Sequence, residues 1–143
     1  MRINEVLKHK AVEGVVTIAP DASVRDLVAL LAEHNVGALI VSVDGTSVDG
    51  IVSERDVVRR LHGDDEVLEA TVDTIMTASV RTCAPDSTVD ELMALMTEHR
   101  IRHVPVVDDG RLAGIISIGD VVKNRMAELE FERDQLDSYV HQS

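Results

Sequence analysis

The spacing of hydrophobic and polar positions changes in a regular order along this chain, and the order predicts five elements in its first half. A β-branched run at residues 14–18 predicts a short strand. Apolar residues then recur every three or four positions over residues 24–31, as on one face of a helix. Apolar runs at residues 37–43 and 50–53 predict two buried strands joined through an Asp-Gly hairpin turn, and a second helix follows. The predicted unit is strand, helix, strand, strand, helix.

The second half of the chain repeats this order. Residues 19–45 align without a gap on residues 84–110, and GIVSERDVV at 50–58 matches GIISIGDVV at 114–122. The repeat therefore also predicts a short strand at residues 79–83 and a second Asp-Gly hairpin turn. Because a unit of about 60 residues buries little apolar surface alone, we expect the two copies to pack together. The predicted fold class is α/β (α+β), built as a tandem repeat.

The predicted organisation has four parts. Short apolar segments, INEVLK and VDTIMT, precede the copies and predict lead-in helices. We expect the first copy with its lead-in at residues 1–62, an acidic linker at 63–71, the second copy at 72–126 and a C-terminal helix at 127–143. Apolar residues recur there at alternating four- and three-residue steps, interrupted by Arg133: Val122, Met126, Leu129, Leu136 and Val140. This spacing favours a subunit contact in a homodimer, the alternative being a helix that folds back on its own domain.

Composition narrows the function classes. The formal net charge is −12 at pH 7, whereas nucleic-acid binders normally carry the opposite sign, so that class is disfavoured. An anionic small molecule remains compatible if a few arginines converge. The only aromatic residues, Phe131 and Tyr139, lie near the C-terminus, so a flat ligand at the repeats would lie between aliphatic side chains. No signal-peptide pattern is present, nor an apolar run near the ~20 residues that a membrane helix needs, which predicts a cytoplasmic protein without a membrane partner.

The motifs of common enzymes and metal sites are missing from the sequence. GTSVDGIV has glycines like a phosphate loop but lacks the Gly-Lys-Ser/Thr ending. His34 and His99 stand at matching helix ends, where a structural role is favoured over metal binding. The single cysteine, Cys83, fits a small core residue better than a nucleophile. We therefore expect no catalysis and no metal.

Each copy carries a Ser-x-x-Asp at the point where a strand is expected to run into a helix. Ser53 with Asp56, and Ser117 with Asp120, have the spacing of a helix-capping box, which is the ordinary structural interpretation. Alternatively, the hydroxyl and the carboxylate could hydrogen-bond a ribose while a phosphate faces the helix N-terminus and a nearby arginine. The spacing alone leaves both interpretations open.

The order of these motifs resembles that of a known family, the cystathionine-β-synthase (CBS) domain pair or Bateman module. The resemblance covers about residues 8–126 and rests on GIVSERD, GIISIGD, HVPVVD and TVDTIMT. It implies two sheets packed face to face with pseudo-twofold symmetry, and two clefts for adenosine-containing ligands such as AMP, ADP, ATP, NAD or S-adenosylmethionine. It also implies a disc-like homodimer.

The resemblance further implies roles for individual positions. The ribose would be held by Ser53, Asp56, Ser117 and Asp120. The adenine would contact Val16, Thr17, Ala38, Thr82, Val104 and Ile115. The phosphates would meet Arg55, Arg102 and His103. We expect Arg55 and Arg102 to reach one shared central cleft, the alternative being solvated surface arginines.

The predicted function is that of a non-catalytic CBS pair, free-standing, with no obligatory cofactor. It would bind an adenine nucleotide between its repeats as a regulatory ligand and signal to an effector protein that the sequence does not identify. Two alternatives remain open: a structural or protein-interaction module with empty clefts, and a redox-coupled regulator acting through Cys83 and a disulfide reductase.

Overall fold

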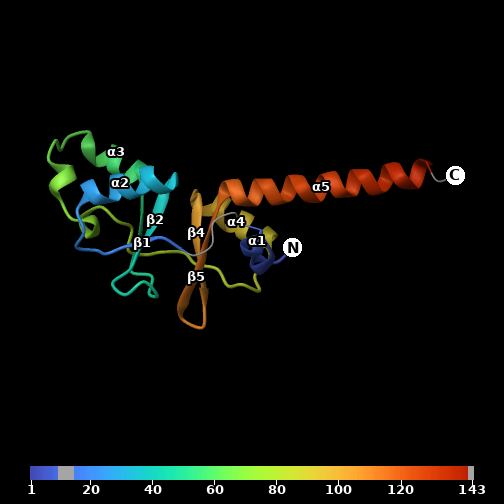
Figure 1. Ribbon diagram of the computed structural model, residues 1–143, viewed down its shortest axis with the longest axis horizontal. Coiled ribbons are helices and arrows are strands. Elements are labelled where there is room, and N and C mark those ends of the chain that lie inside the picture. The colour runs from blue at the N-terminus through green and yellow to red at the C-terminus, as the bar shows by residue number, and fades with distance from the viewer. Residues whose placement is uncertain (10–14, 142–143) are drawn as a thin grey trace.

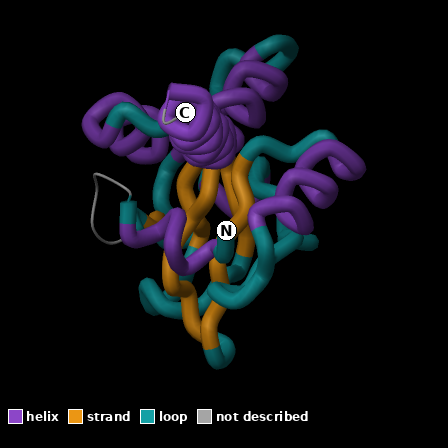
Figure 2. The backbone as a smooth tube through the Cα atoms, turned by 90° about the vertical axis from the view of Figure 1, so that its right-hand side faces the viewer, coloured by secondary structure: helices purple, strands orange, loops and turns teal. Residues whose placement is uncertain are grey.

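The computed structural model describes residues 1–9 and 15–141, in which the two sequence repeats form two small α/β units (Figure 1). The elements up to the linker are α1 Ile3–Lys8, β1 Thr17–Ile18, α2 Val24–His34, β2 Ala38–Val41, β3 Gly50–Ser53 and α3 Glu54–Leu61. The elements after it are the 3-10 turns η1 Val67–Glu69 and η2 Val72–Thr74, then α4 Val89–His99, β4 His103–Asp108, β5 Arg111–Ser117 and α5 Ile118–His141. Figure 2 shows the strands of both sheets at the centre of the molecule and the helices toward its periphery. The predicted mixed class and the two packed repeats are confirmed.

The first repeat is built on a three-stranded sheet in the order β1-β2-β3, with β1 parallel to β2 and β2 antiparallel to β3. Helix α2 begins where Ser23 Oγ accepts the Asp26 N–H at 3.1 Å, and it buries Val24, Leu27 and Leu31 against this sheet. Of the strand predicted at residues 14–18, only Thr17 and Ile18 pair; residue 14 lies outside the described residues.

The second repeat has a two-stranded sheet, β4-β5, because its predicted first strand does not form. Only Cys83 bridges to β4: its N–H donates to Pro105 O at 3.0 Å, and its carbonyl accepts from Val107 N–H at 2.9 Å. In a parallel ladder the next bond would need an N–H from Pro105 to the carbonyl of Arg81, and proline has none. Ile40 occupies the equivalent position in the first repeat, where β1 does form. The strand predicted at residues 79–83 is therefore wrong, except for one bridge.

The two predicted Asp-Gly turns also differ between the repeats. Asp109 and Gly110 both have positive φ, 52° and 76°, and join β4 to β5 in the two-residue hairpin expected for this dipeptide. In the first repeat the connection is a wider loop, residues 42–49, and the tight turn predicted there is wrong. Asp44 Oδ1 accepts the N–H groups of Thr46 at 2.9 Å and Ser47 at 2.8 Å. These N–H groups organise the loop and hold the pKa of Asp44 well below its ordinary value.

The lead-in segments cross over between the repeats. Ile3 and Val6 of α1 are buried in the core of the second repeat, and Ile3 N–H donates to Ser87 O at 2.9 Å. Conversely, Val67 and Val72 of η1 and η2 are buried in the core of the first repeat. The first predicted lead-in helix is confirmed as α1, while the second is shortened to the 3-10 turn η2. Each segment completes the core of the repeat that it does not precede in the sequence.

Helix α5 is continuous across the predicted boundary between residues 126 and 127. It contains both the second helix of the repeat and the predicted C-terminal helix. Val121 is its one buried residue, and its later turns extend away from the rest of the molecule as a rod (Figure 1). The structure shows no fold-back onto the chain's own domain over this length.

Candidate ligand-binding site

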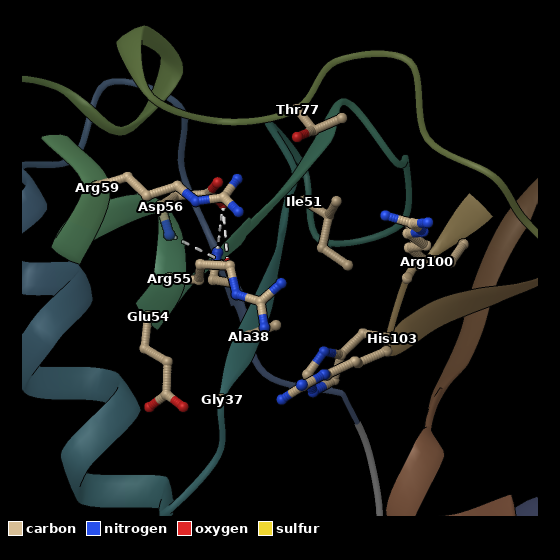
Figure 3. A pocket seen from close by; sticks show the side chains of 13 residues that line it. Gly37, Ala38, Ile51, Glu54, Arg55, Asp56, Arg59, Thr77, Arg100 and His103 are labelled. Carbon is tan, nitrogen blue, oxygen red and sulfur yellow. Dashed lines mark hydrogen bonds between the residues drawn. The ribbon is translucent and has the colours of Figure 1, made fainter. Parts of the chain in front are cut away.

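A cavity of about 280 Å³ lies between the two repeats (Figure 3). From the first repeat it is lined by Gly37, Ala38, Ile51, Ser53, Glu54, Arg55, Asp56 and Arg59. From the second half of the chain it is lined by Thr77, Arg100, Ile101, Arg102 and His103. Ile51 and Thr77, both in its lining, exchange backbone hydrogen bonds of 3.0 and 2.9 Å, and the two repeats are joined where Leu112 N–H donates to Thr46 O at 2.7 Å. The cavity thus exists only because the repeats are packed together.

Ser53 and Asp56 stand at the end of β3 and the start of α3, and they form a complete capping box. Asp56 Oδ2 accepts from Ser53 N–H at 2.8 Å and from Ser53 Oγ at 3.1 Å, while Asp56 N–H donates to Ser53 Oγ at 3.3 Å. Among the described residues, the Asp56 carboxylate accepts its hydrogen bonds through Oδ2. The capping interpretation is correct, and it leaves Oδ1 available at the cavity.

Ser117 and Asp120 form the same capping box at the start of α5, with bonds of 2.8, 3.0 and 3.2 Å. Neither residue lines the cavity between the repeats. The two sequence motifs are therefore locally alike and differ in what lies beside them.

The predicted phosphate residues come together. Arg55 lies on the first turn of α3, and Arg102 and His103 lie at the start of β4, and all three line the cavity. Figure 3 shows Arg55 extending from α3 toward His103. The expectation that Arg55 and Arg102 share a central cleft agrees with this geometry.

Two further arginines, which were not predicted from the sequence, line the cavity. Arg59 lies one helical turn after Arg55 on α3, and Arg100 ends α4 two residues before Arg102. The four-residue step from Arg55 was a usable signal, because residues four apart share a helix face. Arg100 gave no such signal, because its position depends on how α4 ends.

Most predicted adenine contacts lie elsewhere. Ala38 lines the cavity, whereas the structure places five others away from it: Val16, Thr17, Thr82, Val104 and Ile115. Val104 is fully buried in the core of the second repeat. The aliphatic side chains that do line the cavity include Ile51 and Ile101. Ile51 is the first-repeat equivalent of Ile115, so the alignment of the copies contained the signal.

Cys83 does not line the cavity, and its thiol has the properties of an unreactive cysteine. Its Sγ donates to Pro105 O at 3.7 Å, and burial raises the pKa of the thiol from 9.0 to about 11. Reactive cysteines have the opposite properties: the pKa of the thiol is lowered and the sulfur is exposed. Within residues 1–9 and 15–141, no three His, Cys, Asp or Glu side chains are grouped so as to hold a metal ion. None of the helices in this described part has both the length and the apolar character to cross a membrane.

Comparison with known proteins agrees with this architecture. A family model described as CBS domain matches residues 5–63 and again residues 72–127. A putative signal-transduction protein with CBS domains from Burkholderia ambifaria is 44% identical, with a TM-score of 0.83 over 89% of this chain and 95% of that one. The CBS domain protein PAE2072 from Pyrobaculum aerophilum, complexed with AMP, is 28% identical, with a TM-score of 0.76 over 93% of this chain and 99% of that one.

The CBS domain pair of protein MJ0100, in complex with 5′-methylthioadenosine and S-adenosyl-L-methionine, is 25% identical, with a TM-score of 0.79 over 90% of this chain and 98% of that one. Both halves of the chain match the same family model, and the matched structures extend over the whole pair. The chain therefore belongs to the CBS domain family, as a tandem pair of CBS domains.

Proposed function

We propose that this protein is a non-catalytic regulatory module that binds an adenosine-containing ligand in the cavity between its repeats. The observation that carries the proposal is the convergence of a Ser-Asp pair from one repeat and arginines from both in a single cavity. The complexes of related CBS proteins with AMP, and with 5′-methylthioadenosine and S-adenosylmethionine, support an adenosine ligand.

The lining supplies a partner for each part of such a ligand. Asp56 Oδ1 accepts from a ribose hydroxyl while Oδ2 keeps its capping bonds. Ala38, Ile51 and Ile101 give the adenine ring aliphatic surfaces, consistent with a lining that holds no Phe, Tyr or Trp among the described residues. The arginines bind phosphate by charge-assisted hydrogen bonds.

Regulation follows from the position of the cavity. Because the ligand contacts α3 of one repeat and the start of β4 of the other, it favours the arrangement of the repeats that brings these groups together. A ligand shifts a conformational equilibrium only by its difference in affinity for the two states. The signal would pass to an effector protein that recognises one arrangement.

The module is proposed to work as a homodimer that pairs through α5. Leu129 and Leu136 on this helix are 50% and 66% exposed, and Val122, Met126 and Val140 continue the same stripe at heptad-like spacing. A second copy would cover these side chains. A chain ended after Lys123 is expected to sediment as a monomer while the full chain sediments as a dimer; a dimer that survives the truncation would remove α5 from this role.

The ligand proposal is tested by thermal unfolding with AMP, ADP, ATP, NAD and S-adenosylmethionine, each added in turn. A ligand at one hundred times its dissociation constant adds about 2.7 kcal/mol to the free energy of unfolding, which raises Tm by several degrees. We expect Asp56→Ala to abolish the ligand-induced rise. Asp120→Ala is the matched control, because it removes the same capping bonds away from this cavity.

Each outcome is informative. Retention of the rise in Asp120→Ala and its loss in Asp56→Ala would support the cavity between the repeats. Loss in Asp120→Ala alone would place binding outside this cavity. If none of the five ligands raises the Tm of the unaltered protein, the proposed function is overturned.

A further inference from the structure

We infer that this cavity is built for an adenosine ligand with two or more phosphate groups and against adenosine ligands that are uncharged or cationic. The inference rests on the proposed function and goes beyond it by naming the ligand class. The related complexes do not decide this point, since one holds AMP and the other holds 5′-methylthioadenosine with the cationic S-adenosylmethionine.

The first argument is charge. The cavity is lined by four arginines and His103 against two carboxylates, those of Glu54 and Asp56, in a chain whose net charge is −12. The chain has only 14 lysines and arginines, so more than a quarter of them face this one cavity. Such a concentration of positive charge attracts anions and raises their local concentration.

The second argument is that these arginines are left without partners. Among the described residues, no hydrogen bond or ion pair engages the guanidinium groups of Arg55, Arg59, Arg100 and Arg102. Elsewhere the chain satisfies arginine, for example in the pairs Arg25 with Glu69 and Arg125 with Glu128. Positive charges that outnumber the carboxylates beside them repel one another, and an anionic ligand relieves that repulsion.

The third argument is the backbone of Arg100. This residue has φ 54°, in the left-handed region, where it ends α4. Asn35 has φ 51° at the equivalent end of α2, and asparagine or glycine is the ordinary choice there. A long side chain in this conformation costs on the order of 1 kcal/mol, of which the attraction between a cation and the C-terminal end of the helix dipole offsets a part. Unlike asparagine, arginine also adds a positive charge to the cavity.

The number of phosphates follows from the capacity of the groups. A guanidinium binds phosphate oxygens in pairs, so one terminal phosphate, with three oxygens and a charge of about −2, is saturated by two arginines. Four arginines from two sides of the cavity exceed that capacity. A diphosphate or longer chain supplies both the oxygens and the charge. A sulfonium with an amino group, as in S-adenosylmethionine, would place like charge among the arginines.

The experiment is calorimetric titration of the full chain with AMP, ADP, ATP and S-adenosylmethionine, at two salt concentrations. We expect ADP and ATP to bind at least about tenfold more tightly than AMP, with binding that weakens steeply as salt rises. S-adenosylmethionine is expected to be the weakest. Arg100→Asn, which copies the residue at the equivalent position, should lower ADP affinity by about tenfold and AMP affinity much less. The matched control is Arg25→Gln, which removes a surface arginine that already pairs with Glu69 and should change neither.

The outcomes separate the two claims. If AMP binds as tightly as ADP and ATP, or S-adenosylmethionine binds most tightly, the phosphate inference is overturned while the proposed function stands. If Arg100→Asn leaves the ratio of ADP to AMP affinity unchanged, the inference is likewise overturned. If none of the adenosine ligands binds, the proposed function itself fails.

Discussion

Because each lead-in segment packs in the core of the other repeat, a substitution in it should destabilise the repeat that it does not directly precede. Val6 precedes the first repeat but is 1% exposed in the core of the second, whereas Val72 precedes the second repeat and is 0% exposed in the core of the first. Val6→Ala should therefore loosen the second repeat, and Val72→Ala should loosen the first. The two changes remove the same atoms at equal burial, so they form a matched pair.

The magnitude follows from the atoms removed. Val→Ala deletes two methyl groups, worth about 1.6 kcal/mol at ~0.8 kcal/mol each, and incomplete collapse of the small cavity raises this to about 2 kcal/mol. For a domain of this size each kcal/mol lowers Tm by about 3 °C, so both variants should lose about 6 °C. Val28→Ala on α2, where the side chain is 39% exposed, should change stability by less than about 0.5 kcal/mol.

Hydrogen exchange identifies which half has been loosened, because sub-global openings expose the amides of the weakened unit first. In Val6→Ala, exchange should accelerate in α4, β4 and β5. In Val72→Ala, it should accelerate in α2, β2 and β3. Faster exchange in α2 rather than α4 in the Val6→Ala protein would refute the crossed arrangement, and so would a stability equal to that of Val28→Ala.

Two further predictions concern close packing and titration. In Gly50→Ala the new Cβ would lie 2.5 Å from Met76 Sδ and 3.0 Å from a backbone oxygen, so urea unfolding should show a loss of about 1–3 kcal/mol in the free energy of unfolding. In Gly114→Ala the new Cβ would lie 2.6 Å from the movable end of the Leu7 side chain, so this variant should lose less. Equal stability of Gly50→Ala and the unaltered chain would contradict this packing. For Cys83, burial raises the thiol pKa from 9.0 to about 11, so its stabilising effect is complete below pH 9 and is lost as pH rises toward 11. Cys83→Ala should flatten the pH dependence of stability over that window, and rapid alkylation of the native thiol at pH 8 would contradict the raised pKa.

The local features of the fold could be predicted from the sequence, because they depend on near neighbours. The capping boxes at Ser53 and Ser117 and the two-residue turn at Asp109-Gly110 follow from residue chemistry within a few positions. The missing strand before Cys83 could not be read from its own β-branched residues. It depends on Pro105, which lies across the sheet and lacks the N–H that the ladder requires.

The residues of the candidate site could likewise be predicted from the sequence only in part. Arg55, Arg102 and Asp56 were predicted from motif positions in each copy, and they meet in one cavity. Of the predicted adenine contacts only Ala38 lines this cavity, because position in the repeat does not say which copy faces it. Arg100 reaches the cavity through the left-handed end of α4, a conformation that its residue type disfavours.

The crossed lead-ins also mean that the unit of duplication is not the unit of folding. If the backbone were cleaved in the linker at residues 63–66, the N-terminal fragment would carry α1 but not the core that α1 completes. The C-terminal fragment would keep η1 and η2, which belong to the core of the other fragment. The nicked protein should therefore remain associated as two interlocked fragments. Two separate copies of one repeat would complete both cores only by exchanging their N-terminal segments between molecules, and the single polypeptide makes that exchange within itself.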